Sequence, residues 1–307
     1  MINVFIDGSA GTTGLRIVDR LALRQDISLI RLPEELRKSA DARKEAIHSA
    51  DIVFLCLPDA AAVEAAALAE GAAAKIIDTS TAHRTNPAWV YGLPELNGQR
   101  ERIASSSRIA NPGCHASGFV ALVAPLVEQG IFSKDAALTC FSLTGYSGGG
   151  KKMIAEYEAP DRSPLLKGPR QYGLTQQHKH LKEMVKICGL ENAPVFCPIV
   201  GDFYSGMEVT VPLFAKDIRG GMDDIRELYE HYYSDGLIRY DDSTDADGLL
   251  SACAWAGRDD MQVSVHGNEE RILLTARFDN LGKGASGAAI QNMNILLGLD
   301  ESTGLCV

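Results

Sequence analysis

The sequence predicts an α/β protein in which a Rossmann-like, doubly wound parallel sheet is joined to an α+β substrate and dimerisation domain. Strand-like and helix-like segments alternate from residue 3 to residue 110, and a glycine-rich turn follows the first strand. After residue 130, strand-like runs follow one another with few helices between them. Alternation is typical of a parallel sheet, and successive strands are typical of an antiparallel one. We therefore expect one domain from residues 1–115 with 285–307, and a second from residues 116–284.

The first strand, residues 3–7, runs into the sequence GSAGTTG, after which apolar residues recur at helical spacing. Glycines let the backbone approach a pyrophosphate, and the free N–H groups of a helix start bind it. The spacing is G-x-x-G-x-x-G, which departs from the regular G-x-G-x-x-G, so a tight turn without ligand is the alternative. The dinucleotide contacts expected in this loop are Gly8, Ser9, Gly11, Thr12, Thr13 and Gly14.

The second strand-like run, residues 27–32, bears on the choice between NAD and NADP. An acid after this strand typically holds the ribose diol of NAD, whereas an arginine accommodates the 2′-phosphate of NADP. Arg31 lies near the expected position, with Glu34 and Glu35 close behind it. Arg31 therefore favours NADP(H), and a solvated surface arginine is the alternative.

Further segments continue the alternation up to the cysteine turn. A charged helix is expected at residues 34–49, an apolar central strand at residues 51–57 and an alanine-rich helix at residues 60–70. A short strand follows at residues 75–78, and residues 103–110 lead into the turn that precedes Cys114. An almost wholly apolar strand is expected where both faces of a parallel sheet are covered. Ligands of such sheets bind at the carboxyl ends of the strands, so the residues just after residue 110 are candidates for the site.

Cys114 follows Asn111, Pro112 and Gly113 and directly precedes an apolar helix-like segment, residues 116–130. Proline and glycine together mark an abrupt turn. A thiol at the start of a helix lies at the positive end of the helix dipole, which favours the thiolate. Because the thiolate attacks acyl carbons, Cys114 is a candidate nucleophile. A small residue that packs at a turn is the alternative.

The second domain contains five strand-like runs, and the last two are joined by a hairpin signal at residues 267–270. The strands are expected at residues 137–143, 195–199, 207–214, 261–266 and 272–278, with helices at residues 223–233 and 285–297. Strands in succession with few helices favour a mostly antiparallel sheet in this part of the chain.

His178 and His180 open another helix, whose apolar positions 181, 184, 185 and 188 lie on one face. Either histidine is a candidate to take a proton from Cys114 and return it. Surface histidines and half of a metal site are the alternatives. Because no carboxylate at ligand spacing completes a metal site, we predict no metal.

The segment from Gly145 to Lys152 is a glycine-rich loop that ends in two lysines. It does not match G-x-x-x-x-G-K-[ST], so it does not predict a kinase-type phosphate loop. Local positive charge in an acidic chain would suit an anionic substrate, and a solvated lysine-rich loop is the alternative.

Composition limits the functional class. The formal net charge of −10 argues against nucleic acid and against an anionic membrane surface as partners. The longest apolar run, residues 119–127, is far too short to cross a bilayer, and the N-terminus has no basic and apolar regions of a secretory signal. The chain has seven cysteines and no CxxC pair, as expected of reduced thiols in a cytoplasmic protein.

Taken together, these motifs resemble those of N-acetyl-γ-glutamyl-phosphate reductases, in particular the shorter type of that family. Aspartate-semialdehyde dehydrogenases share the architecture and a cysteine nucleophile, but their flanking motifs are less similar. The matching blocks run through the whole chain in order, at residues 8–14, 91–96, 111–115, 145–152, 177–180, 201–207 and 279–285.

The resemblance implies an NADP-dependent phosphorylating aldehyde dehydrogenase of arginine biosynthesis. Such an enzyme reductively dephosphorylates N-acetyl-L-glutamyl 5-phosphate, a small anionic acyl phosphate, to N-acetyl-L-glutamate 5-semialdehyde, and we expect a homodimer or homotetramer. Cys114 would form a thioester, and His178 or His180 would handle the proton. Lys182 stands where the family often has proline, which leaves the choice between the two histidines open.

The resemblance also implies further contacts with cofactor and substrate. The implied cofactor contacts are Asn280, Gly282 and Lys283. The implied substrate contacts are Arg84, Glu95, Arg108, Asn111, Gly145, Tyr146, Ser147, Gly148 and Lys151. Two alternatives stay open: a reductase of another acyl phosphate, similar to aspartate-semialdehyde dehydrogenase, and a non-catalytic NADP sensor.

Overall fold

The computed structural model describes residues 1–246 and 248–307, which form two compact units. The first unit comprises residues 1–113 and 285–305, and the second comprises residues 114–284 and 306–307. The boundary lies two residues earlier than expected because Cys114 is already the first residue of helix α5 (Cys114–Glu128). Residues 306–307 belong to the second unit because the backbone N–H of Asp259 donates to the carbonyl of Cys306 at 2.7 Å.

The first unit is built on a six-stranded parallel sheet with the order β2-β1-β3-β4-β6-β5. Its neighbouring strands are all parallel, as the alternation of strands and helices predicted. After β2 the chain crosses back and adds β3 on the other side of β1, so the strand order reverses at β1. The strands are β1 (Ile2–Asp7), β2 (Ile27–Ile30), β3 (Ile52–Leu55), β4 (Lys75–Asp78), β5 (Val90–Tyr91) and β6 (Arg108–Ala110).

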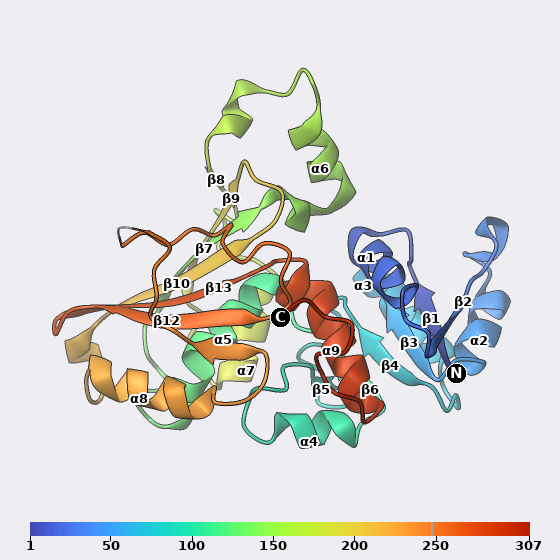
Figure 1. The fold of residues 1–307 in the computed structure, drawn as a ribbon, viewed down its shortest axis with the longest axis horizontal. Helices are drawn as coiled ribbons and strands as arrows, with labels where there is room; N and C mark the ends of the chain where they lie inside the picture. Colours follow the sequence, from blue (N-terminus) through green and yellow to red (C-terminus); the bar gives the residue numbers. More distant parts are fainter. Residues whose placement is uncertain (247) are drawn as a thin grey trace. The chain divides into compact units, whose positions relative to one another are not determined.

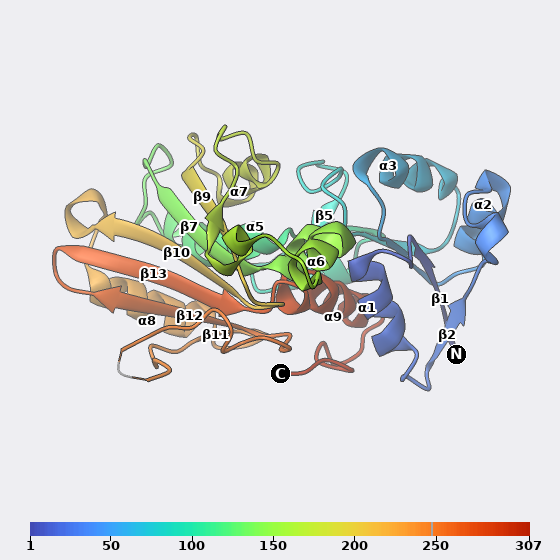
Figure 2. The same cartoon turned by 90° about the horizontal axis from the view of Figure 1, so that it is seen from above.

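Helices cover both faces of this sheet, which confirms the doubly wound fold (Figure 2). Alternate strand residues feed two separate cores: Val4 and Phe54 pack with α1 and α9, whereas Phe5 and Val53 pack with α2 and α3. The helices are α1 (Thr12–Leu21), α2 (Ala40–His48), α3 (Asp59–Leu68), α4 (Gln99–Ala104) and α9 (Gly287–Leu296), with a 3-10 turn η1 (Glu34–Leu36) before α2. The run 103–110 is divided between the end of α4 and β6.

The second unit contains a seven-stranded mixed sheet with the order β11-β12-β13-β10-β7-β9-β8 (Figure 1). Its pairs are antiparallel except β7 with β9 and β11 with β12. The strands are β7 (Thr139–Gly145), β8 (Arg170–Gln171), β9 (Val195–Gly201), β10 (Met207–Phe214), β11 (Ile238–Tyr240), β12 (Met261–Gly267) and β13 (Arg271–Phe278). The mostly antiparallel α+β prediction for this part of the chain is therefore confirmed.

Helix α5 packs against this sheet through Gly118, where an added Cβ would lie 2.6 Å from Val209 Cγ2. On its other sides α5 contacts α7 (His180–Cys188) and α8 (Met222–Tyr232). The remaining helices of the unit are α6 (Gly150–Glu158) and the 3-10 turns η2 (Tyr146–Gly149), η3 (Pro164–Lys167) and η4 (Ala215–Asp217). The π-helical turn η5 (Gly282–Ser286) begins in this unit and ends in the first. Among the described residues, no helix is both long enough and apolar enough to cross a membrane.

Candidate active site

Cys114 lies at the start of the 15-residue helix α5, where its thiol is half-buried. The turn η5 approaches the cysteine closely: a Cβ added to Gly284 would lie 2.9 Å from Cys114 Cβ. Asp279 fixes this turn, since its carboxylate accepts hydrogen bonds from Ser205 Oγ at 3.0 Å and from the backbone N–H of Leu281 at 2.6 Å. The nucleophile predicted from the sequence therefore sits at a helix N-terminus with a rigid turn packed against it.

His115, the next residue, is buried and lies among the rings of His178, His180, Tyr172 and Phe196. Its ring centroid is 5.7 Å from that of His178 and 5.5 Å from that of His180. Its Nδ1 is 2.6 Å from Ser142 Oγ, and its Nε2 is 2.7 Å from the Tyr172 hydroxyl. Burial lowers the pKa of His115 to about 3, with a smaller contribution from His178, so the ring is neutral at working pH.

His178 and His180, the two predicted acid–base candidates, are neighbours at the start of α7. Their ring centroids are 4.8 Å apart, and His178 Nδ1 accepts a hydrogen bond from the backbone N–H of His180 at 3.2 Å. Because Nδ1 is an acceptor, the proton of neutral His178 is on Nε2. Burial lowers the pKa of His178, and the charge of Lys179 lowers it further. His180 is buried, and the carboxyl group of Glu183 lies one helical turn further on the same helix.

Tyr172 is a site residue that the sequence reasoning missed. Burial raises the pKa of Tyr172, and negative charge on Cys114 raises it further. Tyr172 lies just after β8 and is tied to β9 by the hydrogen bond from its N–H to Pro198 O at 3.0 Å. The pairing of β8 with β9 brings it to the site, and no local sequence pattern marks it.

The glycine-rich loop, predicted to contact substrate, is joined to the 279–285 block. Asn280 donates from Nδ2 to Ser147 Oγ at 3.0 Å and accepts from the N–H of Gly206 at 3.0 Å. Gly145 has no room for a side chain, because a Cβ there would lie 2.5 Å from Tyr204 O. The structure thus brings together blocks that are far apart in the sequence.

The other residues of this unit that were predicted to contact substrate or cofactor differ in burial and in their neighbours. Tyr146 stacks on Tyr157 with a centroid distance of 4.8 Å, and Lys151 is exposed on α6. A Cβ on Gly148 would meet Asn280 Nδ2 at 3.3 Å. Lys283 is fully buried, and a Cβ on Gly282 would lie 1.9 Å from Arg258 O, so both are tightly packed within the second unit.

The loop after β1 in the first unit fits a dinucleotide. Gly8 has a φ of +86°, and a Cβ on Gly14 would lie 2.6 Å from Gly8 O, so both positions require glycine. By contrast, a Cβ on Gly11 would have no atom nearer than 3.5 Å. Thr12 Oγ1 is buried and has no hydrogen-bond partner among the residues that the structure describes. An uncapped helix N-terminus beside an open glycine and an unsatisfied hydroxyl is suited to a phosphate group.

Two arginines lie near the carboxyl ends of the first strands. Arg31 directly follows β2 and is exposed, as a contact with a 2′-phosphate requires. Arg43 on α2 was not predicted: its Nε donates to the Asp7 carboxylate at 3.0 Å, and its Nη1 donates to Glu64 at 2.9 Å. Burial raises the pKa of Asp7, and Arg43 opposes that effect. Arg43 thus balances a buried carboxylate immediately before Gly8.

The predicted substrate residues of the first unit fall into two groups. Arg84 lies at the carboxyl edge of the sheet, where its Nε donates to Asn111 O at 2.9 Å and its Nη2 donates to Thr79 O at 3.0 Å. Asn111 donates to Ala285 O at 3.0 Å, so it supports the segment that leads into α9. Glu95 is buried and accepts from Gln291 Nε2 at 2.8 Å.

Arg108 is the exception. It is the first residue of β6 and therefore lies at the amino end of that strand, whereas ligands of parallel sheets bind at the carboxyl ends. Its guanidinium group lies 5.8 Å from the centre of the Trp89 ring and donates to Ala69 O at 3.4 Å. This placement argues against substrate contact at Arg108.

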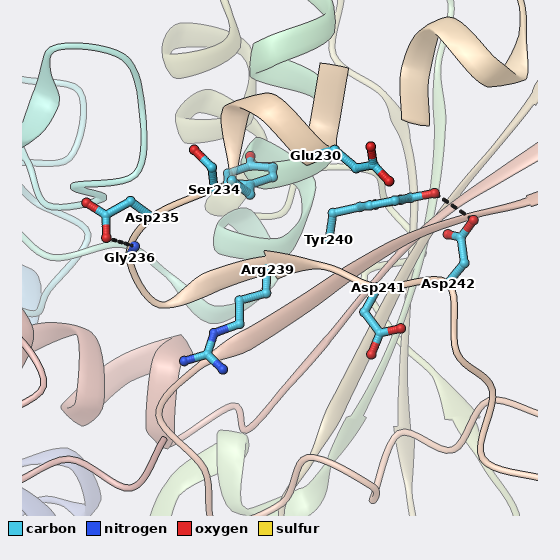
Figure 3. Close-up of a pocket in the computed structure, with 9 residues that line it drawn as sticks. Glu230, Ser234, Asp235, Gly236, Arg239, Tyr240, Asp241 and Asp242 are labelled. Atoms are coloured by element: carbon cyan, nitrogen blue, oxygen red, sulfur yellow. Dashed lines mark hydrogen bonds between the residues drawn. The ribbon is translucent and has the colours of Figure 1, made fainter. Parts of the chain in front are cut away.

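A separate cavity of about 710 Å³ lies in the second unit near the end of α8 (Figure 3). It is lined by Glu230, Tyr233, Ser234, Asp235, Gly236, Arg239, Tyr240, Asp241 and Asp242. With four carboxylates and one arginine, this lining repels an anionic acyl phosphate. Within the described residues, no group of three or more His, Cys, Asp or Glu side chains is arranged to hold a metal ion.

The fold and the cysteine–histidine cluster are those of a semialdehyde-dehydrogenase-type oxidoreductase. Residues 3–106 match the NAD binding domain of semialdehyde dehydrogenases, and residues 114–280 match their dimerisation domain. The fold is shared with aspartate semialdehyde dehydrogenase II of Vibrio cholerae, with a TM-score of 0.73 and 17% identity over 97% of this chain and 98% of that one. The enzyme of Candida albicans, solved with NADP, has a TM-score of 0.66 and 16% identity over 97% of this chain and 98% of that one.

Relatives of similar sequence define the family more narrowly than the shared fold does. An N-acetyl-gamma-glutamyl-phosphate reductase 2 of a Nostoc species is 45% identical over 98% of both chains. An N-acetyl-gamma-glutamyl-phosphate reductase of Brucella ovis is 44% identical over 96% of this chain and 98% of that one. The chain therefore belongs to the N-acetyl-gamma-glutamyl-phosphate reductase family, which confirms the resemblance noted in its motifs, and its first domain is a nicotinamide-dinucleotide-binding domain.

Proposed function

We propose that this protein reductively dephosphorylates N-acetyl-L-glutamyl 5-phosphate to N-acetyl-L-glutamate 5-semialdehyde, with NADPH as reductant, as a step of arginine biosynthesis. The observation that carries the proposal is Cys114 at the N-terminus of α5, with the His178–His180 pair in the same unit. This arrangement, in a chain of this family, provides a nucleophile and an acid–base group for acyl transfer.

The first step is attack by the Cys114 thiolate on the acyl carbon. The new C–S bond forms while the bond between that carbon and the phosphate oxygen breaks, which releases inorganic phosphate and leaves a thioester. The N-terminus of α5 stabilises the thiolate, and its N–H groups are placed to stabilise the oxyanion that develops on the acyl oxygen.

One of the two histidines moves the proton. Neutral His178, with Nδ1 already accepting a hydrogen bond, presents an Nε2–H, whereas Glu183 on the same helix would stabilise a protonated His180. The histidine accepts the thiol proton before attack. It later returns that proton to the departing sulfur as the thiohemiacetal oxyanion collapses to the aldehyde, which regenerates the Cys114 thiol.

NADPH supplies, when bound, the hydride that reduces the thioester to the thiohemiacetal. The loop of Gly8, Ser9, Gly11, Thr12, Thr13 and Gly14 would hold its pyrophosphate, because the helix N-terminus and Thr12 Oγ1 offer unsatisfied donors. Arg31 would bind the 2′-phosphate, which is the basis for preferring NADP(H) over NAD(H). Asn280, Gly282 and Lys283 are proposed as further cofactor contacts.

The substrate carries a phosphate group and an α-carboxylate, and both need cationic or polar partners. Arg84 is held in place by two carbonyl groups, so its guanidinium group is preorganised to bind an anion. Lys151, exposed on α6, is a second candidate. Asn111, Glu95, Gly145, Tyr146, Ser147 and Gly148 are retained as proposed residues of the substrate site.

A homodimer is proposed to form through the face of the second sheet that α5, α7 and α8 leave uncovered. Large apolar side chains are exposed on this face of four adjacent strands. They are Phe141, Val195, Phe214 and Leu273. These residues belong to the region that matches a dimerisation domain. We also propose a cytoplasmic enzyme, since no two cysteines of the described residues are joined in a disulfide.

The experiment that tests the function uses the reverse reaction, because the acyl phosphate is unstable. Enzyme, NADP⁺, inorganic phosphate and N-acetyl-glutamate semialdehyde are mixed and NADPH absorbance is followed, with aspartate semialdehyde in a parallel cuvette. Phosphate-dependent reduction of NADP⁺ with the acetylated substrate alone is expected. A preference for aspartate semialdehyde would keep the mechanism and replace the substrate, and no reaction with either would refute the function.

A further inference from the structure

Three hydrogen-bonded side chains are centred on His115, the residue that follows Cys114 on α5. Ser142, on the inner face of β7, is fully buried, and its Oγ is 2.6 Å from His115 Nδ1. On the other side of the ring, His115 Nε2 is 2.7 Å from the hydroxyl of Tyr172. His115 is also buried, and Phe196 packs edge-on against its ring with a centroid distance of 5.4 Å. The imidazole therefore has one orientation and two fixed partners.

The direction of these hydrogen bonds follows from Ser142. In the part of the chain that the structure describes, His115 Nδ1 is the one hydrogen-bond partner of the Ser142 hydroxyl. A buried hydroxyl that does not donate its proton loses a hydrogen bond, which is costly. Ser142 therefore donates to Nδ1, and the ring proton of neutral His115 lies on Nε2. From Nε2 that proton is donated to the oxygen of Tyr172.

The Tyr172 hydroxyl therefore does not donate its proton to His115. Tyr172 accepts from His115 Nε2–H, so its own O–H is available to donate elsewhere. Cys114 directly precedes His115 at the start of α5, and the Tyr172 hydroxyl is held 2.7 Å from His115 Nε2, so the phenol is fixed near the helix end that carries the nucleophile. Negative charge on Cys114 raises the pKa of the phenol, which agrees with this placement.

We propose that Ser142 and His115 are positioning residues that fix the Tyr172 hydroxyl as a hydrogen-bond donor to the reacting atoms at Cys114. Tyr172 is then a catalytic residue of the proposed reaction, on which this inference rests. It adds a side-chain donor to the backbone N–H groups of α5.

The protonation states of the chain agree with this assignment. Burial lowers the pKa of His115 to about 3, and the nearby His178 and Lys179 lower it further. Burial therefore favours the neutral form of His115, which leaves the proton transfer to His178 or His180. Burial and Cys114 raise the pKa of Tyr172, so the phenol keeps its proton and remains a donor.

The tautomer of His115 is tested by NMR, independently of activity. In enzyme labelled with ¹⁵N-histidine, the His115 resonances are identified by their loss in His115→Gln. The expected pattern has an unprotonated Nδ1 and a protonated Nε2, with the neutral form retained across the pH range of stability. A protonated Nδ1, or titration of His115 near neutral pH, would overturn the proposal even if the enzyme were fully active.

Kinetics test the role of the hydroxyl. Tyr172→Phe removes only the O–H, and kcat is expected to fall on the order of tenfold to a hundredfold, as for one lost hydrogen bond to a charged group, with little change in KM. His115→Leu is expected to cause a similar loss, whereas His115→Gln, which retains an N–H donor near the position of Nε2, is expected to recover most of it. Tyr240→Phe, which removes a phenol hydroxyl bound to Asp242 in the acidic cavity, is the matched control with wild-type kcat.

The double variant separates positioning from packing. If His115 acts through Tyr172, then His115→Leu has no further effect on kcat in the Tyr172→Phe background. Additive losses, or a Tyr172→Phe enzyme with wild-type kcat, would refute the proposal. If the wild-type enzyme lacks phosphate-dependent activity, the proposed function fails, and the NMR measurement still decides the arrangement of the three side chains.

Discussion

Gly284 supports the nucleophile from the turn η5, so Gly284→Ala is expected to displace Cys114 without removing any catalytic group. The added Cβ would lie 2.9 Å from Cys114 Cβ, 3.1 Å from Asp279 O and 3.3 Å from Phe278 Cε2. Carbon atoms in contact are about 3.5–4.0 Å apart, so Cys114 or the turn has to move by about 0.6 Å or more. Asp279 and the buried Phe278 hold the turn side, and the shift therefore falls mainly on the cysteine.

A shift of this size has a predictable cost. Misplacement of a reacting group by about 1 Å can reduce the rate by about a hundredfold, so a kcat loss of about tenfold to a hundredfold is expected for Gly284→Ala. Overpacking also costs about 1–3 kcal/mol of stability. Gly118→Ala is the matched control, since its Cβ would meet Val209 Cγ2 at 2.6 Å and Phe278 Cε1 at 2.8 Å, one helical turn beyond Cys114 on α5.

The assay compares kcat of the reverse reaction and the thermal midpoint of unfolding for the two variants. Both midpoints are expected to fall, and kcat is expected to fall much further for Gly284→Ala than for Gly118→Ala. Gly168→Ala, where a Cβ meets no atom within 4 Å, controls for the substitution itself. A Gly284→Ala enzyme with wild-type kcat, or equal kcat losses in both core variants, would refute the view that the turn sets the position of the thiol.

Four further predictions concern the nucleophile, the cofactor, the base and the dimer. Cys114→Ala is expected to lower kcat on the order of 10⁴-fold or more while NADPH binding, measured by fluorescence, is unchanged; retained activity would exclude the thioester. Arg31→Leu is expected to raise KM for NADPH far more than KM for NADH, and equal changes would remove Arg31 from the 2′-phosphate site. Burial disfavours the charged form of His178, so its pKa lies below the usual histidine value of about 6.5. The ring therefore remains neutral, and able to accept a proton, at pH values somewhat below that value. If His178 is the base, the incoming proton has to displace the hydrogen bond that Nδ1 accepts from the His180 N–H. In that case kcat/KM falls only as pH drops below about 6.5 and His178→Asn abolishes that dependence; persistence of the dependence in the variant assigns it to another group. Val195→Asp is expected to convert the dimer to monomers in light scattering with the secondary structure retained, and an unchanged mass would exclude this face of the sheet.

The fold could be predicted because its signals are local. The apolar runs of the first unit and the hairpin signal of the second can each be recognised within a few consecutive residues. They predicted a parallel sheet and a mostly antiparallel sheet, and both were confirmed. Cys114 was also recognisable, since a turn directly before an apolar helix is a local feature. Position within a strand was harder: Arg108 is close to the cysteine in sequence, yet it lies at the opposite end of β6 from the turn.

The groups around the cysteine could not be predicted from local patterns. Ser142, Tyr172 and Phe196 meet His115 only because β7, β8 and β9 are neighbours in the sheet. The pairing of Asp7 with Arg43 depends likewise on how α2 packs on the parallel sheet. Such contacts are set by topology, and a periodicity over a few residues does not contain that information.

The thioester on Cys114 is the central claim, and its direct measurement is a trapping experiment. Enzyme is mixed with NADP⁺ and N-acetyl-glutamate semialdehyde without phosphate, quenched in acid, and digested for mass spectrometry, while NADPH is followed in parallel. The predicted result is a burst of one NADPH per active site and one N-acetylglutamyl group on the peptide that contains Cys114, both lost in Cys114→Ala. A burst without an acylated peptide, or acylation at another residue, would contradict the mechanism.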